Sequence, residues 1–246
     1  MFFTSRPPKR QVILALAGLL VLAACAAPPP SDTISDPFET ENRNMHAFNL
    51  EIDKAFLKPV AGGYDSIPDP VRRGVNNFSA NLDLPGDVLN NLLQLRIGKA
   101  TENSLRFVLN STIGIGGLLD PARAMGVAGK KTDFGETLHV WGVGEGAFVE
   151  LPLLGPSTQR DALGEVVDIA MNPLGFVLTP PESYVPTVAM ILSKIDDRGR
   201  YSETVDSILY ESADGYAQAR LLYLQNRRYD LGQAAPEASF EDPYAQ

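Results

Sequence analysis

The chain has 246 residues, among them 30 acidic and 21 basic side chains, and its formal net charge at pH 7 is −9. This acidic balance excludes nucleic acid as a partner, and it excludes attachment to anionic lipid headgroups by charge alone. The length allows a single domain to bury a sizeable core.

Residues 1–24 are predicted to be a lipoprotein signal peptide. Basic residues precede the apolar run 12–24, which is shorter than the about 20 apolar residues of a membrane-spanning helix and is typical of a secretory signal. The run ends in Leu22, Ala23, Ala24 and Cys25, a sequence that resembles the lipobox of bacterial lipoproteins. The alternative is an ordinary signal cleavage site followed by an unrelated cysteine.

Cys25 is the only cysteine of the chain, so no disulfide competes for its thiol. We expect it to carry diacylglyceryl and N-acyl groups that anchor the mature protein. The next residue is Ala26 rather than aspartate, which is similar to the sorting preference of outer-membrane lipoproteins. Residues 25–36 are predicted to be a flexible tether, which three successive prolines stiffen. The expected location is therefore the periplasmic side of the outer membrane.

Residues 37–232 are predicted to form one mainly α domain of short amphipathic helices. The first helix is expected to have Asp36 as its N-cap and Pro37 at its first position. Amphipathic stripes like those of this region most often face a core. The helices predicted in the first half of the domain cover residues 36–59, 87–95 and 99–109.

Residues 110–120 join bulky apolar side chains to three glycines and carry no charge before Asp120. Glycine permits unusual backbone conformations and close approach of neighbouring segments. Burial in a protein core and contact with an apolar surface at the membrane are both compatible with this composition.

A short hairpin or an extended loop is expected in the middle of the chain. Residues 137–141 and 147–151 have the composition of β-strands, and the segment between them contains three glycines. A helix is then predicted to begin near Ser157 or Thr158.

Residues 161–178 contain few charges and are interrupted by Asn172 and Pro173, so one straight spanning helix is excluded. Two short apolar helices that lie in a membrane interface fit this pattern, and so does a buried pair of core helices. The candidate membrane-facing residues are Val166, Val167, Leu174, Phe176, Val177 and Leu178.

Two further helices are predicted, over residues 185–195 and 201–229. In the second of these, acidic residues fill the first half and arginines fill the second half, which complements the helix dipole. Residues 233–246 are predicted to be a disordered acidic tail.

The sequence makes no case for an enzyme or for a metal site. The segment 142–147 matches a dinucleotide-binding pattern, but a strand and a turn follow it where that pattern requires a helix. The two histidines, His46 and His139, have no partner pattern for catalysis or metal binding. Five carboxylates could in principle pair as acid and base, although helix starts and solvated faces explain them better: Asp133, Glu136, Asp161, Glu165 and Asp168.

Short motifs follow one another in a characteristic order between residues 36 and 168. They are Asp-Pro-Phe-Glu at 36–39, Asn42-Arg43, Phe48-Asn49, Lys-Pro-Val-Ala at 58–61, Pro-Val-Arg at 70–72, Asn77-Phe78, Asn81-Leu82, Arg106-Phe107, Gly-Ile-Gly-Gly-Leu at 114–118, Asp-Phe-Gly at 133–135, Trp-Gly-Val-Gly at 141–144, Gly-Pro-Ser-Thr at 155–158 and Arg160-Asp161. Together they resemble the MlaA (VacJ) family of outer-membrane lipoproteins, with weaker similarity in the last helix.

The resemblance implies an α-helical disc or ring in the inner leaflet of the outer membrane, which encloses an amphipathic passage. Mislocalised outer-membrane phospholipids would leave the outer leaflet through it as transient ligands, without a cofactor and without catalysis. The resemblance also implies association with trimeric porins. A soluble periplasmic carrier would receive the lipid and pass it to an inner-membrane ABC transporter.

Within that picture, the glycine-rich stretch is the candidate wall of the passage. Irregular backbone at membrane depth needs protein or a water-filled cavity to satisfy its polar groups. The candidate passage residues are Ile113, Gly114, Ile115, Gly116, Gly117, Leu118 and Leu119. Two alternatives stand beside transport: a scaffold lipoprotein that tethers porins or envelope components, and a lipid-modifying enzyme with an unrecognised site. Apolar helices broken by proline favour transport over the scaffold.

Overall fold

The computed structural model of the protein describes residues 34–233. The predicted signal peptide, Cys25 and most of the predicted tether precede these residues. The predicted tail, apart from Gln233, follows them.

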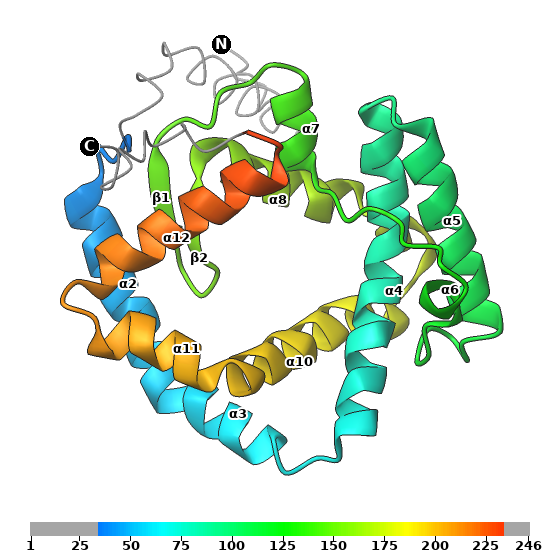
Figure 1. Cartoon of the computed structure of the whole chain (residues 1–246), viewed down its shortest axis with the longest axis horizontal. Helices are drawn as coiled ribbons and strands as arrows, with labels where there is room; N and C mark the ends of the chain where they lie inside the picture. Colours follow the sequence, from blue (N-terminus) through cyan, green and yellow to red (C-terminus); the bar gives the residue numbers. More distant parts are fainter. Residues whose placement is uncertain (1–33, 234–246) are drawn as a thin grey trace, which may run out of the picture.

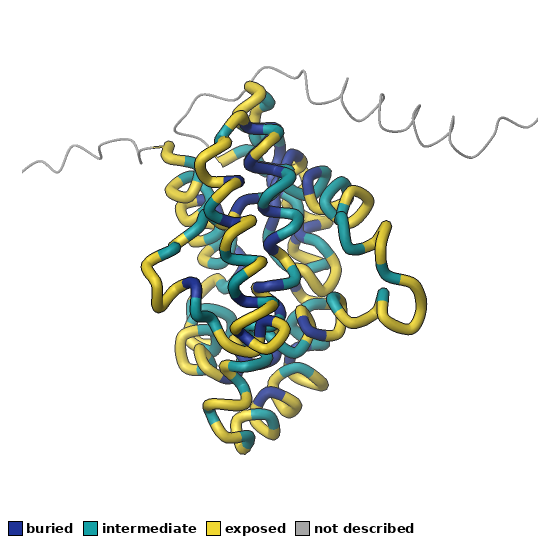
Figure 2. The backbone as a smooth tube through the Cα atoms, turned by 90° about the vertical axis from the view of Figure 1, so that its right-hand side faces the viewer, coloured by how far each residue is buried: buried dark blue, intermediate teal, exposed yellow. Residues whose placement is uncertain are grey.

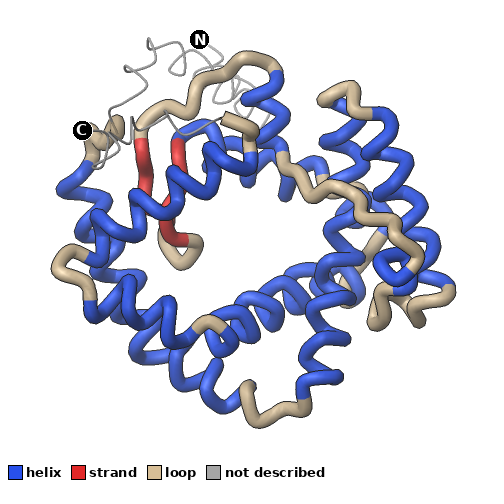
Figure 3. Tube along the Cα trace, in the orientation of Figure 1, coloured by secondary structure: helices blue, strands red, loops and turns tan. Residues whose placement is uncertain are grey.

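The described part of the chain is a ring of helices around a central opening, with one small two-stranded sheet (Figures 1 and 3). The mainly α fold predicted from the sequence is thereby confirmed. Its elements in chain order are α2 (Glu39–Ile52), a π-helical segment (Asp53–Leu57), α3 (Lys58–Tyr64), α4 (Asp69–Leu93), α5 (Ile97–Thr112), α6 (Pro121–Ala124), α7 (Phe134–Val140), β1 (Phe148–Leu151), β2 (Gly155–Thr158), α8 (Gln159–Met171), α9 (Leu174–Val177), a 3₁₀ turn (Glu182–Tyr184), α10 (Val185–Arg200), α11 (Ser202–Asp206), a second π-helical segment (Ser207–Glu211) and α12 (Gly215–Asp230).

The ring is closed by contacts between elements that are distant in the sequence. The helix α10 packs against both α3 and α4, and α4 packs along α5 on the outer side. The helices α7 and α8 pack together, and α12 covers the antiparallel β1–β2 hairpin, whose tip points into the opening (Figure 1). Residues from both ends of the domain therefore border the same opening.

The interior of the protein contains few apolar side chains. One buried apolar cluster joins Phe148 of β1 to Tyr216 and Leu224 of α12. The other fully buried large side chains are polar, and the dark blue positions in Figure 2 form narrow stripes along the helices. These polar side chains are Asn91, Asn103, Thr137, Thr158 and Asp196. Helices arranged around an opening have two accessible faces each, so little space is left for a dry core.

Hydrogen bonds from asparagine side chains replace apolar packing at several contacts between elements. The Asn42 amide of α2 donates to the carbonyl oxygen of Phe148 and accepts from the backbone N–H of Glu150. The Asn103 amide of α5 bonds the backbone of Lys130 in both directions. Such paired bonds satisfy buried backbone groups that would otherwise be costly to desolvate.

The predicted strand over residues 137–141 is wrong, because these residues belong to the helix α7. The Asp133 side chain caps this helix by accepting a hydrogen bond from the backbone N–H of Glu136. A cap of this kind contributes about 1 kcal/mol, which is enough to outweigh the strand preference of β-branched residues in so short a segment. Residues 148–151 do form a strand, but its partner is residues 155–158 and not the predicted strand 137–141.

Several predicted helix boundaries also differ from the structure. The first helix begins at Glu39, and Asp36 binds α12 instead of acting as its N-cap. The chain does not end its helix at Pro59 but continues through the π-helical segment into α3, where proline at an early position costs little. The predicted helix 87–95 is the second half of the 25-residue α4, which contains Pro85. The predicted helix 201–229 is interrupted, and Asp214 caps its last part.

The other helix predictions agree with the described structure. Residues 99–109 lie within α5, and residues 185–195 lie within α10. Thr158 caps α8, as the predicted start near this residue requires, and Pro173 separates α8 from α9. In residues 34–233, no helix combines the length and the apolar character needed to cross a membrane.

Gly164 of α8 sets the distance between α8 and α7. A Cβ atom at this position would lie 2.4 Å from the backbone nitrogen and 2.7 Å from the Cα of Gly135. We expect Gly164→Ala to lower the free energy of unfolding by about 1–3 kcal/mol, because backbone atoms must move to relieve the clash. Chemical denaturation of the purified protein measures this change.

Gly62→Ala is the matched control for that prediction. Gly62 lies in α3, and no atom lies within 4 Å of its ideal Cβ position. Alanine there should raise the free energy of unfolding by about 0.5–1 kcal/mol through its helix preference. Equal effects of the two substitutions would show that the α7–α8 contact does not depend on Gly164.

Candidate functional site

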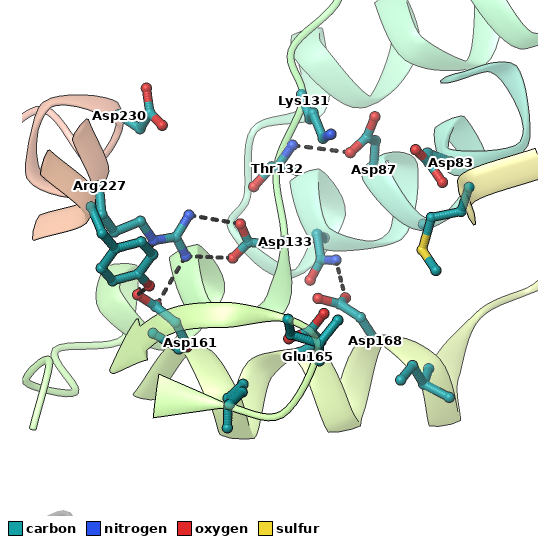
Figure 4. A pocket seen from close by; sticks show the side chains of 18 of the residues that line it. Asp83, Asp87, Lys131, Thr132, Asp133, Asp161, Glu165, Asp168, Arg227 and Asp230 are labelled. Carbon is teal, nitrogen blue, oxygen red and sulfur yellow. Dashed lines mark hydrogen bonds and ion pairs between the residues drawn. The ribbon is translucent and has the colours of Figure 1, made fainter. Parts of the chain in front are cut away.

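A cavity of about 580 Å³ lies inside the ring (Figure 4). Its wall is made by α4, the segment that precedes α7, the β1–β2 hairpin, α8, α10 and α12. These elements are spread over most of the described chain, so the cavity exists only when the ring is closed.

One part of the cavity wall is apolar. It includes Leu151 and Leu154 of the hairpin, Ile169 of α8 and Met190 of α10. Leu154, Ile169 and Met190 remain exposed although they are large and hydrophobic. The rest of the wall is rich in charged side chains, so the cavity is amphipathic.

Arg227 of α12 forms the main ion-pair cluster of the wall. Its guanidinium donates to both carboxylate oxygens of Asp133 at 2.7 Å and to Asp161 of α8 at 2.9 and 3.1 Å (Figure 4). Burial alone would raise the pKa of Asp161, but the Arg227 guanidinium holds it below its ordinary value. The same hydrogen bonds raise the pKa of Arg227 against the effect of burial. Asp161 and Arg227 stay ionised, and the cluster fixes α12 to α7 and α8.

A second group of carboxylates lies along α4. Asp83, Asp87 and Asn90 are spaced by four and three residues, which places them on one face of the helix. The side chain of Asp87 is buried, with 7% of the residue exposed, and its Oδ1 accepts a hydrogen bond of 3.0 Å from the backbone N–H of Thr132. Burial raises the pKa of Asp87 to about 7.

Asp168 of α8 completes this side of the cavity. It accepts hydrogen bonds from the Asn90 amide at 2.7 Å and from the backbone N–H of Phe134 at 2.8 Å. Burial raises its pKa despite these bonds. In the part of the chain that the structure describes, no three His, Cys, Asp or Glu side chains are grouped to hold a metal ion.

The glycine-rich stretch 113–119 forms the turn between α5 and α6. None of its residues contributes to the wall of the cavity described above. Gly114 and Gly117 are buried, and a Cβ atom at Gly117 would lie 2.7 Å from the Asn81 side chain of α4. Ile115 has a φ of 54° and is 66% exposed. The glycines thus allow α4 and the turn to approach closely, while lipid contact by this stretch stays a prediction.

The candidate membrane-facing residues fall into two groups. Val166, Phe176 and Val177 are exposed, and Phe176 reaches 78%. The other three, Val167, Leu174 and Leu178, are partly buried. Their contact with a membrane likewise stays a prediction.

Four of the five carboxylates considered as acid–base pairs line the same cavity, namely Asp133, Asp161, Glu165 and Asp168. Asp133 and Asp161 both bind Arg227. Glu136 lies outside the wall and pairs with Arg96 and Lys130.

The face of α4 that carries Asp83, Asp87 and Asn90 was not predicted from the sequence. Its helical spacing was visible, but the predicted helix began only at residue 87 and so divided the face.

Comparisons with known proteins agree on one family. The model of the MlaA lipoprotein family matches residues 34–230. The intermembrane phospholipid transport system lipoprotein MlaA of Escherichia coli (strain K12) is 34% identical over 242 residues, which cover 95% of this chain and 92% of that protein. The protein of the same name from Haemophilus influenzae is 30% identical over 90% of both chains.

An uncharacterised protein of Rickettsia bellii is also similar, with 36% identity over 79% of this chain and 76% of its own length. Among solved structures, one described as the structural basis for maintenance of bacterial outer membrane lipid asymmetry matches with a TM-score of 0.69 and 32% identity. The match covers 80% of this chain and 99% of that one.

Asp87 should make the stability of the protein depend on pH. Its pKa is about 7 in the folded protein against an ordinary value of 3.8, so the folded state binds the proton more tightly than the unfolded chain. Its stabilising contribution is fully present below about pH 4 and is lost as the pH rises through 7. The amide of an Asp87→Asn variant is always neutral and keeps an acceptor for Thr132. At pH 8 we therefore expect this variant to be more stable than the wild type by roughly 2–4 kcal/mol.

The measurement is the free energy of unfolding of both proteins at pH 4 and pH 8. The difference between them should nearly vanish at the lower pH, where both side chains are neutral. A difference that is the same at both pH values would mean that burial of the Asp87 charge does not cost what its surroundings indicate.

Proposed function

Because the chain belongs to the MlaA lipoprotein family, we propose that it removes mislocalised phospholipids from the outer leaflet of the outer membrane. The lipid passes through the amphipathic cavity inside the ring and is handed to a soluble periplasmic carrier. The observation that carries this proposal is a cavity with an apolar part and a charged part, enclosed by helices with exposed apolar side chains. No covalent change of the lipid is involved.

The lining of the cavity suits a phospholipid because the lipid, like the cavity wall, has an apolar part and a charged part. Acyl chains can contact the leucines of the hairpin together with Ile169 and Met190. The headgroup can contact the charged residues of α4 and α8. A scaffold that only tethers other proteins has no need for such a space, so the cavity favours transport over that alternative.

The body of the protein lies in the membrane interface in this proposal. Several exposed apolar side chains, among them Val166, Phe176 and Val177, offer a surface that acyl chains can cover. The acyl groups on Cys25 hold this body at the outer membrane. In this proposal a trimeric porin positions it there, and the carrier delivers the lipid to an inner-membrane ABC transporter. The names of the relatives support only membership of an intermembrane phospholipid transport system.

Gly86 offers a way to block the cavity without disturbing the fold. It lies in α4 and lines the cavity, and no atom lies within 4 Å of its ideal Cβ position. We expect Gly86→Trp to fill part of the cavity, so that cells with this variant accumulate outer-leaflet phospholipid as deletion cells do. Gly86→Ala removes the glycine but adds only a methyl group, and it should restore the wild-type level. Surface labelling of phospholipid in intact cells measures the effect.

Two further strains make the outcome decisive. Cells without the protein should show more outer-leaflet phospholipid than the wild type, and an unchanged level would favour the scaffold. Ile115→Asp places a charge in the exposed turn of the glycine-rich stretch, outside the cavity wall. If this variant fails while Gly86→Trp functions normally, the lipid moves along the 113–119 turn and not through the cavity.

A further inference from the structure

The charges that line the cavity are unequal in number. The guanidinium of Arg227 is already bound by Asp133 and Asp161. The wall then presents five other carboxylates against two ammonium groups, and within residues 34–233 none of these seven takes part in an ion pair. They are Asp83, Asp87, Glu165, Asp168 and Asp230 on the acidic side, and Lys131 and Lys194 on the basic side.

Asp87 has a carboxylate oxygen that the described protein leaves without a partner. Its Oδ1 accepts from Thr132, whereas its Oδ2 has no hydrogen bond to any residue of the described range (Figure 4). The residue is more than nine-tenths buried and lines the cavity. Asp83 lies one helical turn away on the same face of α4. A buried carboxylate with a free oxygen is a strong acceptor for a cationic group that enters the cavity.

We propose that this cavity selects phospholipids whose headgroup carries an ammonium group, the ethanolamine class, over phospholipids with a net negative headgroup. The ammonium lies against Asp87 and Asp83, and Lys131 of the same wall meets the phosphate. This inference rests on the proposed lipid passage and adds the class of lipid that it prefers.

The preference follows from the sign of the field in the cavity. A cleft lined mainly by one sign of charge attracts ions of the opposite sign and repels ions of the same sign. A glycerol headgroup leaves the phosphate charge uncompensated, so at a pH above the raised pKa of Asp87 an anionic lipid meets more carboxylates than ammonium groups. An ethanolamine headgroup has no net charge and brings a donor to the unpartnered oxygen of Asp87. Discrimination here needs repulsion of one lipid as well as attraction of the other.

The test uses the full-length protein in detergent micelles that contain phosphatidylethanolamine and phosphatidylglycerol in equal amounts with identical acyl chains. The experiment is done at pH 8, where the Asp87 carboxyl is largely ionised. Lipid that stays bound after separation from the micelles is identified by mass spectrometry. We expect the ethanolamine lipid to be enriched about three- to ten-fold, as two or three partly exposed ionic contacts would give. High salt should reduce this enrichment.

The double variant Asp83→Asn with Asp87→Asn should bring the bound ratio close to that of the mixture. Its control is Glu41→Gln with Glu203→Gln, which makes the same change in net charge at exposed residues outside the cavity wall. The control should keep the wild-type enrichment. Equal enrichment in wild type and double variant would overturn the assignment to α4.

The lipid amount separates this inference from the function on which it rests. If the wild type binds phospholipid in the ratio of the mixture, the headgroup preference is wrong and the lipid passage stands. If it binds no phospholipid at all, the proposed passage fails and the preference fails with it.

Discussion

Arg227 joins three parts of the chain that are far apart in the sequence. From α12 it reaches Asp133 at the start of α7 and Asp161 near the start of α8. Arg227 and Asp161 are largely buried, and removing one partner of a buried pair typically costs about 3–5 kcal/mol, because a charge is left without compensation. The closure of the ring therefore depends on Arg227. An apolar residue of similar volume at this position would leave the carboxylates of Asp133 and Asp161 without this ionic partner.

The same principle recurs around the ring. Asp36 binds Tyr216 and Arg220 of α12, Arg198 of α10 binds Asp53, and Asp196 of α10 is held by residues of α4. Each of these contacts joins segments that are more than 100 residues apart. A compact domain of this length would use a shared apolar core for the purpose. A ring cannot do so, since both faces of its helices remain accessible, and directional polar contacts replace the missing core.

Much of the helical framework could be predicted from the sequence, because apolar periodicity and caps such as Thr158 are local signals. The strand 148–151 was also recognisable, whereas its partner was not, since Gly155 and Pro156 are typical of turns. The full length of α4 escaped prediction because a proline inside a helix, here Pro85, normally ends it, and the π-helical segments have no signal in the apolar periodicity. The cavity could not be predicted at all. Its charged residues come from α4, the segment before α7, α8, α10 and α12, and their meeting depends on long-range closure.

The placement of polar and apolar residues also reverses the usual order of a water-soluble domain. Large apolar side chains such as Phe176 and Val177 are exposed, while aspartates and asparagines occupy the interior. This arrangement is stable when acyl chains cover the outside and the polar groups inside bond to one another. Closure of the ring pairs Arg227 with Asp133 and Asp161. It leaves Asp83 and Asp87 of α4 and Glu165 and Asp168 of α8 at the cavity without ionic partners in the described chain. The architecture that excludes a dry core thus also produces the excess of negative charge on which a choice between headgroups can act.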